Sequence, residues 1–198
     1  MPQISAELAT LVGSRICHDL ISPIGAISNG LELLDLAGSF KGPEHDLIAE
    51  SVASANARIR FFRIAYGAAG EQMLGRAEVA GVLRDHGQTA RLRMDWQPQD
   101  PQPRREVRLA FLALQCLETA LPYGGEAQIG CEGDSWAITG RGDCSGLDGA
   151  LWDRLSASVP LGDLAPARVQ FALLPVLAQD AGRRLTTTRD AEALSIRF

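Results

Sequence analysis

The chain has 198 residues, of which 46 % are hydrophobic and 22 % are charged, and its formal net charge is −5. This is the composition of a soluble globular protein with its own core, and the acidic balance argues against nucleic acid as a partner. The opening residues, MPQISAELATLVGSR, are not those of a signal peptide, and no apolar run reaches the roughly 18 residues of a membrane-spanning helix. We therefore expect a cytoplasmic protein that contacts neither nucleic acid nor a membrane.

The N-terminal part of the chain has helical periodicity. A first helix is expected from residue 4 to about residue 37, with an apolar seam spaced 4, 3, 4, 3 at Leu20, Ile24, Ile27, Leu31 and Leu34. Gly38 ends this run, and a turn leads to Pro43, which suits the first turn of the next helix.

The second helix shows a similar seam and ends at the glycines of residues 67–70. Residues 1–70 are therefore predicted to form a helical hairpin. Because a lone hairpin buries little apolar surface, pairing with a second copy into a dimeric four-helix bundle is the expected solution. Packing against the rest of the same chain is the alternative.

From residue 75 onward the sequence pattern is one of mixed helices and strands. Two segments in which apolar and polar residues alternate flank Gly133 and Asp134, and together they predict a β-hairpin. The predicted helices are 76–89, 104–121, 150–156 and 165–181, and the predicted strands are 91–96, 126–132, 135–141, 184–189 and 193–198. Residues 75–198 thus predict a second domain, an α/β sandwich, and the fold class of the whole chain is α+β.

A stripe of small and polar residues surrounds one histidine of the first predicted helix. Residues three and four apart share a helix face, which groups Arg15, His18, Ser22, Gly25 and Asn29. None of these side chains is large and apolar, so His18 is expected at an exposed edge, well away from the apolar seam. A surface histidine on a solvated face is the alternative interpretation.

The chemistry expected of His18 is nucleophilic. An exposed imidazole has a pKa near 6.5 and is mostly neutral in the cytosol, and Asp19 could orient the ring or take its proton. Pro23 cannot donate to the carbonyl of Asp19, which predicts a local bend just after the histidine. No metal cluster or serine-based catalytic set accompanies His18, so attack on a phosphoryl group delivered by another protein fits best.

The segment His18-Asp19-Leu20-Ile21-Ser22-Pro23 resembles the H-box of two-component histidine kinases. In that family the hairpin dimerises, the histidine is phosphorylated, and the following α+β domain has a GHKL-type fold that binds ATP. The second half of this chain departs from the kinase pattern. Gln115 and Thr119 stand at two asparagine positions, Gly140 stands at the position of the adenine-binding aspartate, and the glycine-rich lid is missing. We therefore expect no bound ATP.

An intact phosphoryl acceptor beside a degenerate ATP site is similar to the ChpT-type histidine phosphotransferases of alphaproteobacteria. That resemblance implies a homodimer that takes a phosphoryl group from the receiver domain of a hybrid histidine kinase. It passes the group to the receiver domains of response regulators, in that family those that control the cell cycle. The chain itself would bind no cofactor or metal, because Mg²⁺ is expected on the partner receiver domain.

Carried over to this sequence, the resemblance makes His18 the phosphoryl acceptor and Asp19 its partner. Arg15 and Ser22 would steady the phosphoryl oxygens. The remaining positions expected to support the site or contact the receiver are Pro23, Gly25 and Asn29. Ser22 also occupies a place where bifunctional kinases carry a residue that aids dephosphorylation, so a weak phosphatase activity stays open.

Two other functions stay open as alternatives. One is a non-catalytic dimeric regulator that binds receiver domains, and the other is an ATP-using kinase with a divergent site. His45 and His86 are predicted to be surface or capping residues. The four cysteines, Cys17, Cys116, Cys131 and Cys144, have no metal-ligand spacing and are predicted to be reduced, mainly buried thiols.

Overall fold

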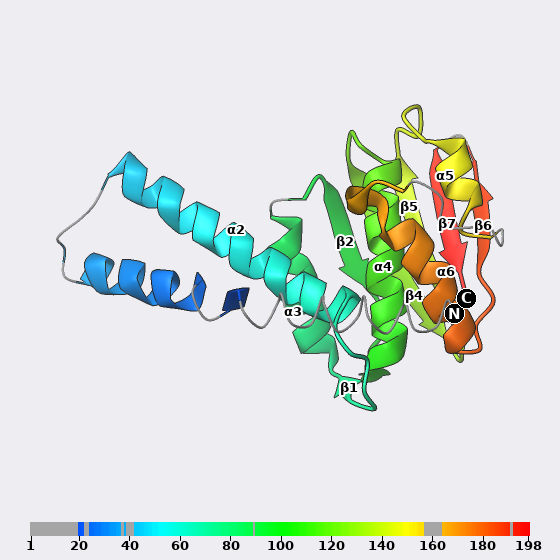
Figure 1. Ribbon diagram of the computed structural model, residues 1–198, viewed down its shortest axis with the longest axis horizontal. Coiled ribbons are helices and arrows are strands. Elements are labelled where there is room, and N and C mark those ends of the chain that lie inside the picture. The colour runs from blue at the N-terminus through cyan, green and yellow to red at the C-terminus, as the bar shows by residue number, and fades with distance from the viewer. Residues whose placement is uncertain are drawn as a thin grey trace.

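A helical hairpin projects from a two-layer α+β body in the computed structural model (Figure 1). Helices lie beside a mixed β-sheet, which confirms the predicted α+β class. The residues that the structure describes are 20–21, 24–36, 38, 42–88, 90–156, 164–190 and 192–198.

The hairpin consists of the helix formed by residues 24–36 and helix α2 (Pro43–Ala65), which run antiparallel (Figure 1). Gly38 has a φ of 63° and donates its N–H to the carbonyl of Asp35 at 3.1 Å, which closes the turn after the first helix. Pro43 stands in the first turn of α2, as predicted, where its missing N–H costs no hydrogen bond.

The sheet of the α+β body has five strands in the order β2-β4-β5-β7-β6. Only β2 and β4 pair in parallel; the other neighbours are antiparallel. The predicted β-hairpin is confirmed, with Glu132 paired to Ser135 and Gly133 in the turn at a φ of 59°. The five strands are β2 (Leu92–Trp96), β4 (Gly125–Glu132), β5 (Ser135–Gly142), β6 (Thr186–Arg189) and β7 (Ala193–Arg197).

The four predicted helices of the second half are present with shifted bounds: α3 (Arg76–Gly87), α4 (Arg104–Ala120), α5 (Gly149–Asp153) and α6 (Gln170–Asp180). The last of them is preceded by a separate 3₁₀ turn, η1 (Pro166–Arg168), where a single continuous helix was expected. Two short strands, β1 (Met73–Leu74) and β3 (Gln102–Pro103), pair antiparallel. They were not predicted, because two residues are too few to show a period.

Helix α4 is the centre of the core. From Glu106 to Leu114 every residue of this helix is buried, including the charged Glu106 and Arg108. It contacts the sheet through β4 and β5 and also packs on α2 and α6. A helix that covered only the sheet would bury a single stripe, so these further neighbours explain why α4 is buried on all sides.

Helix α2 takes part in both halves of the molecule. Its last turns contribute Phe61, Ile64 and Ala65 to the core of the α+β body, and all three are buried. Its first turns, in contrast, stand away from that body (Figure 1). The position of the hairpin is therefore determined by the C-terminal end of α2.

The projecting part of the hairpin exposes large apolar side chains. Leu33, Leu36 and Leu47 are 67 %, 85 % and 66 % exposed. The predicted seam residues Leu20, Ile27 and Leu34 are also exposed, and Ile24 and Leu31 are half-buried. A single copy of the chain thus leaves the seam uncovered. Within the described residues, no helix combines the length and the apolar character needed to cross a membrane.

Candidate functional site

Most of the residues predicted to form the site belong to the first part of the first predicted helix. Arg15, His18, Asp19, Ser22 and Pro23 fall outside the described residues.

Gly25 and Asn29 lie four residues apart in the helix 24–36 and therefore share a face. Gly25 is half-buried, and a Cβ atom added to it would meet no other atom within 4 Å, while Asn29 is exposed. Both positions are open to a partner, and their contact with a receiver domain stays a prediction.

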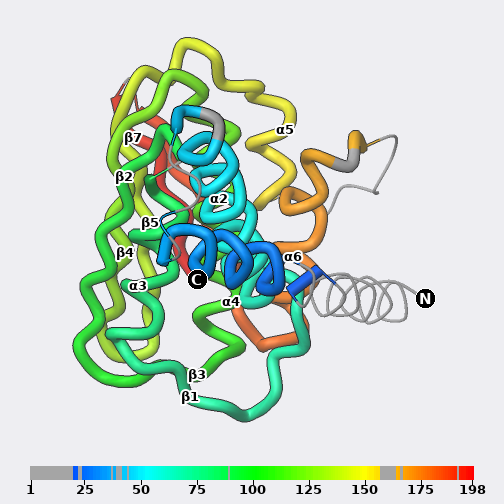
Figure 2. The backbone as a smooth tube through the Cα atoms, turned by 90° about the vertical axis from the view of Figure 1, so that its left-hand side faces the viewer, coloured from blue at the N-terminus to red at the C-terminus, as the bar shows by residue number. Residues whose placement is uncertain are grey.

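A groove of about 790 Å³ runs beside this helix. Figure 2 shows the helix 24–36 and α2 side by side in front of the α+β body. The groove is lined from three elements, by Ser28 of the first helix, by Ser51 and Arg60 of α2, and by Asp85 and Gln88 at the end of α3. An ion pair of 2.8 Å between Arg60 and Asp85 joins α2 to α3 here. The hairpin and the α+β body thus build the groove together.

The two histidines that the structure describes are buried, so their prediction as surface residues is wrong. His45 is 3 % exposed and lies 3.7 Å from Asp35, where it connects the two hairpin helices. His86 is 7 % exposed, stacks on Phe61 with ring centroids 4.2 Å apart, and lies 3.1 Å from Glu118. Both histidines join helices from within, and the helix periodicity did not reveal this because the covering partners are distant in sequence.

The side chains at two positions that the kinase resemblance assigns to nucleotide binding are engaged in internal hydrogen bonds. Gln115 accepts a hydrogen bond of 2.7 Å from the hydroxyl of Tyr66. Thr119 donates to the backbone carbonyl of Gln115 at 3.0 Å, and its hydroxyl accepts from the side chain of Gln170 at 3.0 Å. These side chains join α2, α4 and α6, and their polar groups are directed at one another.

Gly140 lies on strand β5 directly against α4. A Cβ atom at this position would come within 2.9 Å of Leu121 Cδ1 and 3.0 Å of Leu117 Cδ2. The space that an aspartate would need is therefore filled by two leucine side chains. An aspartate here would have to displace the ends of these two leucine side chains and would place its carboxylate among apolar groups.

Comparison with known proteins identifies the family. The family model of the histidine phosphotransferase C-terminal domain matches residues 76–193. Protein phosphotransferase ChpT of Brucella abortus (strain 2308) is 31 % identical over 193 residues, which are 94 % of this chain and 92 % of that protein. The chain belongs to the histidine phosphotransferase family. A solved bacterial phosphotransferase supports the same fold, with a TM-score of 0.68, 28 % identity, and coverage of 98 % of this chain and 95 % of that one.

The partly buried hydroxyl of Tyr66 allows a test at alkaline pH. Burial raises the pKa of Tyr66 to about 12, whereas tyrosine in an unfolded chain titrates near 10. The folded state binds the proton more tightly, so the contribution of Tyr66 to stability is complete below about pH 10 and is lost between about pH 10 and 12. We expect the difference in unfolding free energy between wild type and Tyr66→Phe to shrink by roughly 1 kcal/mol from pH 9 to pH 11.

Urea unfolding of both proteins at the two pH values measures this difference. All other titrating groups are common to wild type and variant and cancel in the subtraction. An unchanged difference would show that Tyr66 titrates like a free phenol. Tyr66 would then not be held in the contact between the C-terminal end of α2 and α4, which we call the joint between α2 and α4.

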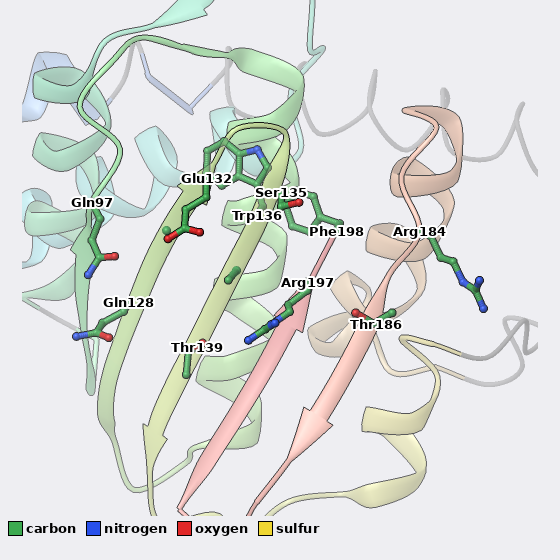
Figure 3. Close-up of a pocket in the computed structure, with 12 residues that line it drawn as sticks. Gln97, Gln128, Glu132, Ser135, Trp136, Thr139, Arg184, Thr186, Arg197 and Phe198 are labelled. Atoms are coloured by element: carbon green, nitrogen blue, oxygen red, sulfur yellow. The ribbon is translucent and has the colours of Figure 1, made fainter.

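A second hollow, of about 530 Å³, lies on the face of the sheet away from α4. Thr139 of β5 and Arg197 of β7 lie on this face, and Gln128 and Glu132 of β4 also line the hollow (Figure 3). Because side chains alternate along a strand, Thr139 points away from the helix layer that Gly140 contacts. The hollow is therefore separate from the positions assigned to nucleotide binding.

Two aspartates between β5 and α5 accept local backbone hydrogen bonds. Asp148 accepts a hydrogen bond from the N–H of Leu151 at 3.1 Å and caps α5, and Asp143 accepts one from the N–H of Ser145 at 2.8 Å. Of the cysteines, Cys116 is buried and Cys131 and Cys144 are partly exposed. In the described part of the chain, no group of three or more His, Cys, Asp or Glu side chains could hold a metal ion.

Several polar residues of the joint between α2 and α4 were not predicted. The hydroxyl of Tyr66 was not predicted to make a structural hydrogen bond, and Arg104, Arg108 and Gln170 were not singled out. The position of Arg108 next to the apolar run of residues 109–114 is the one signal that could have drawn attention to it, because a buried arginine requires partners.

Proposed function

We propose that this family member is a phosphorelay histidine phosphotransferase that carries a phosphoryl group on His18. The donor is the aspartyl phosphate of a hybrid-kinase receiver domain, and the acceptors are the receiver aspartates of response regulators. Family membership over almost the whole chain supports the class of reaction. The burial of the other two histidines supports His18 as the acceptor residue.

The burial of two histidines is the observation that carries the proposal. The chain has three histidines, and His45 and His86 are only 3 % and 7 % exposed. In-line transfer requires the ring nitrogen to approach a phosphorus atom on another protein to about 3 Å, which a side chain packed between helices cannot do. His18 is the histidine that this argument does not exclude.

The proposed step exchanges one phosphorus bond for another. A ring nitrogen of neutral His18 attacks the phosphoryl group of the receiver aspartate, a P–N bond forms, and the P–O bond to the aspartate breaks with the carboxylate as leaving group. Asp19 would orient the ring, and Arg15 and Ser22 would hold the phosphoryl oxygens. Mg²⁺ bound by the receiver would neutralise charge during transfer. Transfer to the next receiver is the same step in reverse.

The packing of the second half supports a phosphoryl source other than ATP. Leu117 and Leu121 fill the space beside Gly140, and Gln115 and Thr119 are engaged in internal hydrogen bonds. A nucleotide needs backbone or side-chain groups that are free to meet adenine and phosphate. We therefore infer that this half of the chain, a degenerate relative of the GHKL fold, binds no nucleotide.

A homodimer completes the proposal. The large exposed apolar residues are concentrated on the hairpin, which also leaves its predicted seam uncovered. A concentration of exposed apolar side chains of this kind favours a protein interface. Two hairpins joined along their seams would form a four-helix bundle, and light scattering should give the mass of two chains.

The decisive experiment incubates the purified protein with a phosphorylated receiver domain and Mg²⁺. We expect label to appear on the chain as an acid-labile, base-stable phosphoryl group, which distinguishes a phosphohistidine from an aspartyl phosphate. Binding of the receiver without transfer would favour the non-catalytic regulator. Labelling by ATP alone, together with micromolar ATP binding in a titration, would favour the divergent kinase.

A further inference from the structure

Two arginines of α4 hold the C-terminal end of α2. Arg104 donates through Nη2 to the carbonyl of Arg63 at 2.9 Å and through Nε to that of Ala68 at 3.1 Å. Arg108, one turn later, donates through Nε to the carbonyl of Ala65 at 3.3 Å. The last carbonyls of a helix lack partners within the helix and carry partial negative charge. The two guanidinium groups therefore bind the end of α2 as a charged cap.

This arrangement brings two like charges together. Burial and the nearby Arg104 guanidinium lower the pKa of Arg108 to about 10, and burial and Arg63 lower the pKa of Arg104. Both groups stay protonated at neutral pH, so desolvation and repulsion are unfavourable contributions to folding. The carbonyls of α2 offset this cost only while α2 stays in place. Any swing of α2 away from α4 would break the hydrogen bonds that Arg104 and Arg108 donate to these carbonyls.

Two further contacts hold the same joint. The hydroxyl of Tyr66, at the end of α2, donates to Gln115 in the second half of α4. The ring of Phe61 packs between His86 and Phe111, which come from α3 and α4. Contacts are thus distributed over about three turns of α4, from Arg104 to Gln115. A single contact would permit rotation, but contacts spread along a helix do not.

We propose that Arg104, Arg108 and Tyr66 are positioning residues that lock α2 against α4 and hold the hairpin and the α+β body as one rigid unit. The inference rests on the proposed function, because it assigns these residues a part in phosphoryl transfer. The groove beside the helix 24–36 has walls from both halves, with Ser28 from the hairpin and Gln88 from the α+β body. A receiver domain docked along the hairpin meets a surface whose shape depends on the lock.

The lock is tested by distance measurements between the two halves. Spin labels are attached through a ketone-bearing unnatural amino acid at positions 46 and 93, both of which carry exposed charged side chains in the wild type. Labelled chains are mixed with an excess of unlabelled chains, so that distances within one chain dominate. We expect a narrow distribution in wild type and a broad one in Arg104→Gln/Tyr66→Phe. The matched control, Arg105→Gln, removes an exposed arginine next to Arg104 and should stay narrow.

Phosphoryl transfer to the same proteins tests the positioning role. Misplacement of about 1 Å can lower transfer by up to about a hundredfold, so kcat/KM with a phosphorylated receiver should fall by roughly ten- to a hundredfold in the double variant and stay unchanged in the control. Arg108→Lys should lower kcat/KM only in part, because lysine retains the positive charge but loses the planar donor group of arginine. Circular dichroism confirms that each variant is folded, and Arg104→Gln alone is used if the double variant is not.

The outcomes separate the two proposals. A narrow distance distribution in a folded lock variant would overturn the lock. A broad distribution with undiminished transfer would overturn the positioning role. If the wild type accepts no phosphoryl group at all, the proposed function fails, and the distances still decide whether the joint is rigid.

Discussion

Replacement of His18 by alanine or glutamine is expected to abolish labelling by a phosphorylated receiver. The acceptor nitrogen is the nucleophile of the proposed step, and neither replacement side chain can form a P–N bond in its place. We expect transfer to fall by at least about a thousandfold, because loss of a covalent nucleophile removes the reaction path itself. The measurement is the amount of acid-labile phosphoryl group on the chain after mixing with the labelled receiver.

The other two histidines provide matched controls. His86→Gln keeps a group able to donate to Glu118, and His45→Gln keeps a polar group near Asp35. Both variants should lose some stability, because their positions are buried, but they should still be labelled. Transfer to His86→Gln is expected to be slower, since His86 stacks on Phe61 in the contact between α2 and α4, so His45→Gln is the cleaner control. Full labelling of His18→Ala, or loss of labelling in a folded His45→Gln variant, would show that the acceptor was assigned to the wrong residue.

Gly140→Asp is the second change with a large expected effect. It restores the acidic residue that the kinase resemblance places here, yet its Cβ would lie within 3.0 Å of two leucine side chains. The carboxylate would have to enter an apolar layer without a partner, so we expect a loss of roughly 3–5 kcal/mol of unfolding free energy and no ATP binding. Urea unfolding measures the first quantity and calorimetric titration the second.

Neighbouring substitutions show whether the effect comes from the leucine contacts. Thr139→Asp places the same charge one residue away on the open face of β5 and should cost far less. Gly140→Ala adds the methyl group alone and should cost about 1–3 kcal/mol, because the leucine ends can shift. If Gly140→Asp were as stable as wild type and bound ATP, the helix-facing packing of β5 would be wrong and the divergent kinase would be favoured.

Much of the fold could be predicted because local rules are strong in particular segments. Pro43 begins α2, Gly38 adopts the left-handed conformation after the first helix, and Gly133 forms the turn between β4 and β5. Each is set by steric limits on the residue itself, which act in any context. The periods of helix and strand likewise report which side of an element is apolar.

The candidate site was predictable only as a pattern. The stripe around His18 and its resemblance to an H-box indicated an acceptor histidine, and the substitutions at Gln115, Thr119 and Gly140 indicated a lost nucleotide site. What occupies those positions instead was invisible in the sequence. The hydrogen bond from Tyr66 to Gln115 joins residues 49 positions apart, and Gly140 meets leucines from outside its own strand.

By itself, then, the sequence determined most of the elements and the α+β class, and it indicated the candidate acceptor histidine, because backbone sterics, periodicity and a contiguous motif are local properties. The tertiary structure alone decided that β2 pairs with β4 in parallel, that His45 and His86 are buried, and that two arginines of α4 bind the end of α2. The spacing of apolar residues along a segment predicts which face of the helix or strand will be covered. The element that covers it, and the polar groups that meet there, depend on contacts between distant segments, which only the folded chain brings together.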